Sequence, residues 1–152
     1  MTTRDINERE YVTATIGEQM FGLPIDRVQD VFVVDRVTRV PLSQTDVVGV
    51  MNLRGRIVTV IDMGRRLGLP SQRPEAAPMA IGVDDRGESY GLLIDEVGEV
   101  LTLSHETREA NPANLDATLA AVSVGVHRLD GKVLVVLDVD RILDFERKLN
   151  AA

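Results

Sequence analysis

Short runs of β-branched and apolar residues, bounded by turn residues, dominate the hydrophobic pattern of this chain, and such runs are typical of β-strands. The clearest case is a predicted hairpin, in which residues 47–53 and 57–61 flank Arg54 and Gly55. A two-residue hairpin turn needs a left-handed backbone, which glycine adopts readily and a long charged residue does not. We therefore interpret Arg54 as a cation presented to a partner, with a solvated turn residue as the alternative.

The same pattern predicts further strands over residues 11–16, 20–23, 31–34, 37–40, 79–83, 89–94, 99–103, 121–129 and 132–137. Pro24 suits the first position of a helix, and apolar residues at helical spacing after it predict a short helix over residues 24–30. Residues 63–69 are expected to form a helical turn or an irregular closure, and residues 105–119 are expected to be mostly loop. Helical spacing also predicts a C-terminal helix over residues 138–149.

Two stretches of the sequence occur twice. Residues 49–62 match residues 125–138 at a constant offset, and residues 21–31 match residues 90–100 at a slightly smaller one. Because both halves carry these signals in the same order, we expect two similar β modules rather than one large sheet. A module of this size buries little surface alone, so two small barrels packed together are the economical arrangement. The extra residues of the second half are expected in its long loop.

This repeat supplies an internal control for Arg54. The second copy has Asp130 at the matching position, followed by Gly131, and Asp-Gly is a favoured two-residue turn. The turn therefore does not require Arg54 for its shape, which strengthens the interpretation of Arg54 as a binding residue. Gly55 and Gly131 are expected to serve the backbone of the two turns. Asp30 is a candidate partner for Arg54, provided that the predicted short helix packs beside the hairpin tip.

The domain organisation follows from the repeat and from the proline-rich stretch between its copies. We expect a flexible tail over residues 1–10, a first barrel unit over 11–70, a linker over 71–78, and a second barrel unit with the C-terminal helix over 79–149. The first strands of each unit have two open alternatives, because they can pair within their own barrel or cross to the other one.

Composition and charge narrow the range of functions. The 152 residues include no cysteine, so disulfides and thiolate metal sites are excluded. The net charge of −7 and the lack of a basic stripe argue against a nucleic-acid binder. The N-terminus is polar, and no apolar run approaches the length of a membrane span. We therefore expect a cytoplasmic protein that does not insert into the membrane.

No catalytic constellation is visible in the sequence. His105 and His127 stand apart from any cluster of metal-ligating residues, and the serines lack the surroundings of a nucleophile elbow. There is no glycine-rich phosphate loop, and the paired carboxylates at Asp84-Asp85 and Asp95-Glu96 are typical of solvated turns and strand ends. We expect no enzymatic activity, no metal and no cofactor.

Several of these stretches resemble the CheW family of chemotaxis coupling proteins. The resemblance rests on Gly49-Val50-Met51-Asn52-Leu53-Arg54-Gly55 followed by Ile57-Val58-Thr59-Val60-Ile61-Asp62. It is supported by residues 21–31 and by Tyr90-Gly91-Leu92-Leu93-Ile94-Asp95-Glu96-Val97 in the second half, and it extends from Tyr11 to about Leu143. The sequence departs from the family pattern at Thr59, where the family often has proline.

The resemblance implies an all-β fold of two five-stranded SH3-like barrels. It also implies a non-enzymatic adaptor in a two-component system, which links the cytoplasmic tip of methyl-accepting chemoreceptors to the regulatory domain of the histidine kinase CheA at membrane receptor arrays. The receptor-side residues carried over by position are Val28, Asp30, Asn52, Arg54, Met79, Ala80 and Val100. The rival class is a small OB-like module that binds a ligand or nucleic acid.

Overall fold

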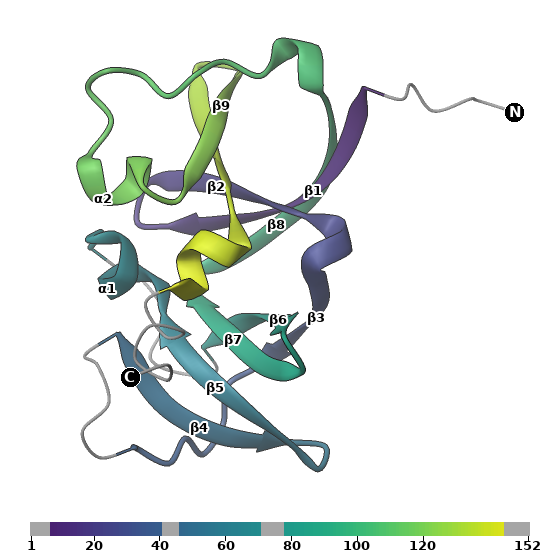
Figure 1. Cartoon of the computed structure of the whole chain (residues 1–152), viewed down its shortest axis with the longest axis vertical. Helices are drawn as coiled ribbons and strands as arrows, with labels where there is room; N and C mark the ends of the chain where they lie inside the picture. Colours follow the sequence, from purple (N-terminus) through teal and green to yellow (C-terminus); the bar gives the residue numbers. More distant parts are fainter. Residues whose placement is uncertain (1–6, 41–45, 71–77, 145–152) are drawn as a thin grey trace, which may run out of the picture.

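The computed structural model describes residues 7–40, 46–70 and 78–144, and its strands form two five-stranded sheets, one above the other in Figure 1. The first sheet consists of β1 (Glu8–Ile16), β2 (Gln19–Pro24), β8 (Glu96–Ser104), β9 (Ser123–Leu129) and β10 (Lys132–Leu137). The second consists of β3 (Val28–Val33), β4 (Val47–Leu53), β5 (Arg56–Asp62), β6 (Met79–Asp85) and β7 (Glu88–Ile94).

Each sheet draws strands from both halves of the sequence. The order is β8-β1-β2-β10-β9 in the first sheet and β3-β6-β7-β5-β4 in the second. The β1–β2 hairpin thus joins the late strands through a parallel pairing of β2 with β10. The β6–β7 hairpin joins the early strands through a parallel pairing of β7 with β5. The first two strands of each repeat therefore complete the sheet of the other repeat, and folding couples the two halves.

The prediction of an all-β fold with two five-stranded units is confirmed by these sheets. Within the described part of the chain, no ladder joins β8 to β9 or β3 to β4, so each sheet has two open edges. The closure that the word barrel implies is not confirmed. The edges matter for function, because an edge strand presents unpaired backbone groups and outward side chains to a partner.

The apolar side chains form one large core and two smaller ones. The large core includes Phe21, Ile61, Ile81 and Leu92, and it draws on both sheets. One smaller core belongs to the second sheet and consists of Phe32, Met51, Val58, Val60, Ala80 and Leu93. The other belongs to the first sheet and is centred on Tyr11, Leu134 and Val136. Only three phenylalanines and two tyrosines are available in the whole chain, so aliphatic side chains carry most of the packing.

Short helices lie at the junctions between strands. Met63–Leu67 form α1, which is the helical of the two predicted alternatives, and Asp62 caps it by accepting a hydrogen bond from the Arg65 amide. The loop after β8 holds two helical turns, η2 (His105–Thr107) and α2 (Ala117–Ala120). Residues 139–144 are helical, which confirms the start of the predicted C-terminal helix; its residues 145–149 lie outside the described part. Arg66 of α1 donates to the carbonyls of Arg141 and Ile142 in this helix.

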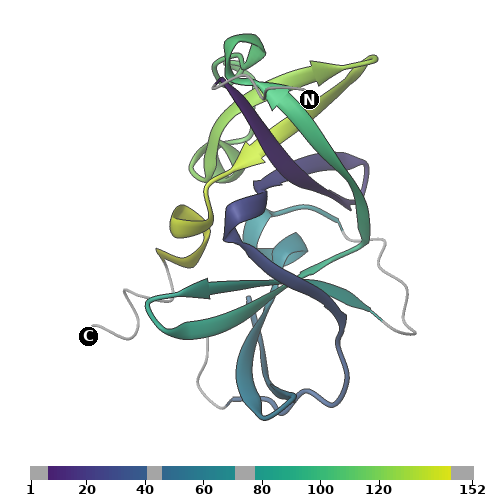
Figure 2. The same ribbon diagram turned by 90° about the vertical axis from the view of Figure 1, so that its right-hand side faces the viewer.

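The predicted helix over residues 24–30 is wrong. Only η1 (Ile25–Arg27) is helical, and Figure 2 shows this turn where the chain passes from β2 of the first sheet into β3 of the second. The backbone of Pro24 is extended, with φ −55° and ψ 131°, and Phe32 is buried opposite Ala80 of β6. Sheet pairing therefore overrides the helical spacing of a few apolar residues, because it buries Phe32 and satisfies the backbone hydrogen bonds of β3.

Other predicted boundaries also shift. The predicted strand over residues 37–40 is reduced to a single bridge, between Thr38 and Val50 of β4. The first strand begins at Glu8, earlier than predicted. Residues 1–6 of the predicted tail and residues 71–77 of the predicted linker lie outside the described part of the chain.

The internal repeat is visible in the backbone of the two matching hairpins. Each has a bulge at the repeated glycine: Gly49 has a φ of 154° and Gly125 a φ of 148°. Beside each bulge, one residue of the preceding loop bridges the outer strand, namely Thr38 to Val50 and Glu109 to Val126. A Cβ at either glycine would collide with the carbonyl of that loop residue. The two halves thus share their irregularities as well as their strands, as duplication predicts.

Candidate functional site

The β4–β5 hairpin places Arg54 at its tip in an uncommon conformation. Arg54 has a φ of 54° and Gly55 a φ of 86°, and Leu53 pairs with Arg56 across the turn. Both central residues are left-handed, as in a type I′ turn. The side-chain oxygen Oδ1 of Asn52 accepts a hydrogen bond of 2.8 Å from the Gly55 amide. Gly55 and Gly131, whose φ is 81°, hold the turn positions that the sequence predicts for them.

A shallow hollow lies beside this tip. It is lined by Gln29 and Asp30 of β3 and by Leu53, Arg54 and Arg56 of the hairpin. Arg54 and Asp30, which the sequence proposes as partners, are therefore brought to the same place. The ion pair, however, forms with Arg56: its Nη2 lies 3.8 Å from Oδ2 of Asp30. Among the described residues, Arg54 has no ion-pair partner, so its guanidinium is free for another molecule.

Asp30 is held firmly at the edge of the second sheet. It pairs with Gly82 of β6, and its Oδ1 is buried where a Cβ on Gly82 would otherwise lie. The Asp30 carboxylate therefore fits in this position only because Gly82 has no side chain. With one oxygen buried and the other facing Arg56, Asp30 has little freedom to follow Arg54.

Exposed apolar side chains follow the open edges of the two sheets. On β3, Val31 and Val33 are 39% and 47% exposed, and they lie opposite Ile81 and Met79 in the ladder. On β8, Val100 is 49% exposed and lies opposite Val12.

Paired residues of an antiparallel ladder point to the same face. Ile81 and Val12 belong to the large core. Val31 and Val100, which lie opposite them, therefore stand at the solvent-exposed margin of that core. We call Val28, Val31, Val33, Met79, Val97 and Val100 the apolar rim.

The structure divides the proposed receptor-side residues into three kinds. Asn52 and Arg54 are exposed at the hairpin tip, and Asp30 lies beside them. Val28, Met79 and Val100 belong to the apolar rim. Ala80 is fully buried in the smaller core of the second sheet, packed with Phe32, so it supports the surface from below and offers no side chain to a partner.

Sequence reasoning missed three residues of this region. Arg56 was not singled out, although it holds Asp30, and Val31 and Val33 were not assigned to the surface. The alternation along β3, in which Phe32 is buried between two exposed valines, is a strand signal that could have revealed them.

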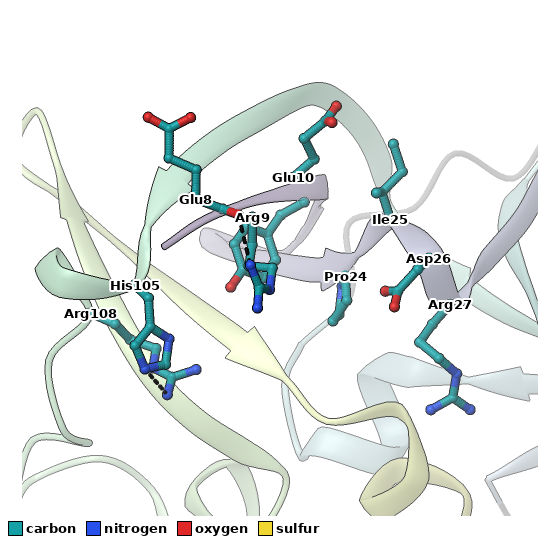
Figure 3. A pocket seen from close by; sticks show the side chains of 10 residues that line it. Glu8, Arg9, Glu10, Pro24, Ile25, Asp26, Arg27, His105 and Arg108 are labelled. Atoms are coloured by element: carbon teal, nitrogen blue, oxygen red, sulfur yellow. Dashed lines mark hydrogen bonds between the residues drawn. The ribbon is translucent and has the colours of Figure 1, made fainter. Parts of the chain in front are cut away.

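A larger hollow than the one beside Arg54 lies elsewhere, between β1, η1 and η2, and Figure 3 shows the side chains that line it. The three arginines Arg9, Arg27 and Arg108 are balanced by three carboxylates, and His105 also lines the hollow; the carboxylates belong to Glu8, Glu10 and Asp26. Arg27 is already paired with Asp140 at 2.9 Å, and the His105 ring approaches Arg108 rather than a carboxylate or a hydroxyl. The hollow therefore contains no nucleophile and base in contact and no excess of charge of one sign.

His127 is a buried titratable residue of the first sheet. Its Nδ1 lies 3.3 Å from the hydroxyl of Thr107, while its Nε2 is buried and has no hydrogen-bond partner among the residues that the structure describes. Burial lowers the pKa of His127 most, and the nearby charges of Arg108 and His105 lower it further, against a smaller opposing effect of Glu109. The neutral imidazole is therefore the form that the fold favours.

Across residues 7–40, 46–70 and 78–144, no group of three or more histidine, aspartate or glutamate side chains is arranged to hold a metal ion. In the same residues, no helix has both the length and the apolarity that a membrane span requires.

Comparison with known proteins gives a consistent result. A family model described as "CheW-like domain" matches residues 10–147. The "Chemotaxis protein CheW" of Rhizobium meliloti is 26% identical over 140 residues, which cover 92% of this chain and 90% of that protein. The "Chemotaxis protein CheW" of Thermotoga maritima is 27% identical over 139 residues, which cover 91% of this chain and 90% of that protein. The crystal structure of the scaffolding protein TtCheW from Thermoanaerobacter tengcongensis matches with a TM-score of 0.81 at 25% identity, covering 94% and 92% of the two chains.

Proposed function

The chain belongs to the CheW-like family of chemotaxis scaffold proteins, and we propose that it couples methyl-accepting chemoreceptors to the histidine kinase CheA. Members of this family are scaffold or adaptor proteins and are not known as enzymes. The rival interpretation as an OB-like ligand or nucleic-acid module is not favoured by this assignment. In the proposal, the chain works in the cytoplasm and is held at receptor arrays through protein contacts.

The proposed receptor side is the surface formed by the β4–β5 tip and the apolar rim. The observation that carries it is Arg54, an exposed cation without an ion-pair partner among the described residues, next to an ion pair that already occupies Asp30. Exposed valines on β3 and β8 supply apolar area, and such area drives association when a partner covers it. A coiled-coil tip offers a complementary surface, because helices present apolar stripes flanked by charged residues.

The proposed mechanism is simultaneous binding. The receptor tip binds at the rim and at Arg54, and the regulatory domain of CheA binds at another part of the chain. Because the β1–β2 and β6–β7 hairpins are exchanged between the two sheets, a force on one sheet is transmitted to the other through hydrogen-bonded strands. The two partners are thus held at a fixed relative position.

A reconstituted array tests this proposal. The chain is combined with its own receptor fragments and CheA, and the autophosphorylation of the kinase is measured for Arg54→Ala and for Arg86→Ala. Arg86 is the matched control, because it occupies the same left-handed turn position in the β6–β7 hairpin. We expect Arg54→Ala to lower receptor-dependent activation and Arg86→Ala to leave it unchanged. Normal activation by Arg54→Ala at matched protein levels would refute the receptor-side assignment.

A further inference from the structure

Three hairpins of this protein close with the same kind of turn. Arg54-Gly55, Arg86-Gly87 and Asp130-Gly131 are all two-residue turns in which both residues have positive φ. An arginine in this position is therefore a recurring solution of the fold, and it does not by itself mark a binding site. What distinguishes the first turn must lie in the residues around it.

The residue that precedes each turn by two positions separates the three cases. In β4 it is Asn52, whose Oδ1 accepts the hydrogen bond from the Gly55 amide. In β6 it is Asp84, whose carboxylate accepts from the Ser89 hydroxyl at 3.0 Å instead. In β9 it is Arg128, which cannot accept a hydrogen bond and pairs with Glu109 at 2.9 Å. Of these three turns, all within the described residues, only the one that carries Arg54 is fixed by a side chain at this position.

We infer that Asn52 is a positioning residue, which fixes the Arg54-Gly55 turn and thereby presents the Arg54 guanidinium to the receptor; this inference rests on the proposed function. The two other turns show that the hairpin closes without such a bond, so stability of the fold does not demand it. An arginine is sterically disfavoured in the left-handed region, so a free Arg54 would tend to leave it. The Asn52 amide opposes that tendency, because the hydrogen bond to Gly55 forms only when the turn is closed.

The Asp30–Arg56 pair adds to the same arrangement. Asp30 is the carboxylate that lines the hollow next to Arg54, and Arg56 holds it at 3.8 Å. Asn52 fixes the backbone of the turn, and Arg56 forms an ion pair with the Asp30 carboxylate, which would otherwise attract Arg54. Binding of a partner then costs less conformational entropy, because the cation is already aimed outward.

A double-mutant cycle tests the inference. The affinity of the whole chain for a signalling-tip fragment of its own chemoreceptor is measured for the wild type, Asn52→Ala, Arg54→Ala and the double variant. We expect Asn52→Ala to weaken binding about fivefold, the size of one lost hydrogen bond, and to have no further effect when Arg54 is already alanine. Asn52→Ser, which keeps an acceptor oxygen, should recover part of the affinity. Asp84→Ala in the β6–β7 hairpin is the matched control and should bind as the wild type does.

A second readout reports on the turn itself. Amide hydrogen exchange at Gly55, followed by NMR, should become about fivefold faster in Asn52→Ala and stay unchanged in Arg54→Ala. Equal weakening by Asn52→Ala in both backgrounds would overturn the inference, because Asn52 would then act by a contact of its own. Unchanged affinity of Asn52→Ala, beside a weakened Arg54→Ala, would overturn it as well and leave the proposed function intact. Wild-type affinity of Arg54→Ala would instead refute the receptor side of the proposed function, and the inference with it.

Discussion

Asp30 forms its ion pair with Arg56, and not with Arg54, although both arginines line the same hollow. Oδ1 of Asp30 is buried against Gly82, and only Oδ2 faces the hairpin. Arg56 is the first residue of β5 and is paired with Leu53 in the ladder, whereas Arg54 lies in the turn. The two arginines at this hairpin tip therefore differ in role: Arg56 pairs with Asp30 within the protein, and Arg54 faces solvent.

The first prediction concerns Arg56→Ala. The free energy of unfolding should fall by less than about 1 kcal/mol, because both members of the pair are partly exposed to solvent. Binding to the receptor tip should nevertheless weaken severalfold, because Asp30 is then left without its cation and attracts Arg54. Urea denaturation and a binding titration separate the two effects. The double variant Arg56→Ala with Asp30→Asn should recover affinity, and a failure to do so would contradict this account of the pair.

The second prediction concerns the turn residues. Arg54→Gly and Arg86→Gly should each change the free energy of unfolding by less than about 1 kcal/mol, because glycine relieves the left-handed strain but gains entropy in the unfolded chain. The two variants should be alike in stability and different in receptor binding, which only Arg54→Gly loses. Thermal unfolding and a receptor pull-down measure both. A large loss of stability in Arg54→Gly alone would mean that Arg54 has a structural task.

The third prediction concerns the packing of the terminal helix. Leu143 is fully buried in the large core, and so is Leu67, the residue at the matching repeat position in α1. Leu143→Ala and Leu67→Ala should each lower the free energy of unfolding by about 2–5 kcal/mol, since each leaves a cavity in a packed core. Equilibrium denaturation measures the loss. A cost well below 1 kcal/mol for Leu143→Ala alone would show that the terminal helix contributes little to the fold.

Much of this architecture was predictable from the sequence, because the same strand and turn signals occur in both copies of the repeat. The hairpins around Gly55 and Gly131 and the family resemblance are confirmed. The exchange of the first hairpins between the sheets was not predictable, since pairing of β2 with β10 depends on contacts between residues far apart in the chain. The helix expected after Pro24 failed for the same reason: β6 supplies a pairing partner that no local pattern reveals.

The candidate site was predicted in part. The sequence identified Arg54 and offered Asp30 as its candidate partner, on condition that a predicted helix packed beside the hairpin tip. It did not reveal that Arg56 forms the ion pair with Asp30. Arg54 stands out in the sequence because one repeat copy has Asp130, yet the Arg86-Gly87 turn shows that the fold accepts arginine there. Ala80 was assigned to the surface by family position, whereas its burial follows from its place opposite Phe32 in the ladder.

The last prediction concerns His127, which occupies the repeat position of Met51, so that a titratable ring replaces an apolar side chain in the smaller core of the first sheet. Its pKa in the folded protein lies below the ordinary value of 6.5, because of burial first and the charges of Arg108 and His105 second. The unfolded chain therefore binds the proton more readily, and stability is fully present above about pH 6.5 and is lost as the pH falls below it. Because a single proton is involved, the slope of this loss stays below about 1.4 kcal/mol for each pH unit. His127→Met, which copies the residue found in the other half of the repeat, should remove this pH dependence.

Denaturation curves of the wild type and of His127→Met at pH 7.5 and pH 5.5 measure the effect. The wild type should lose more stability between the two conditions than the variant, and the difference between the two losses isolates the imidazole from the carboxylates that both proteins share. His105→Gln keeps the buried ring of His127 but removes one of the smaller charges that lower its pKa, so this variant should retain part of the pH dependence, whereas His127→Met removes it. Equal losses in the wild type and in His127→Met would contradict the assignment, since they would mean that other groups carry the acid sensitivity.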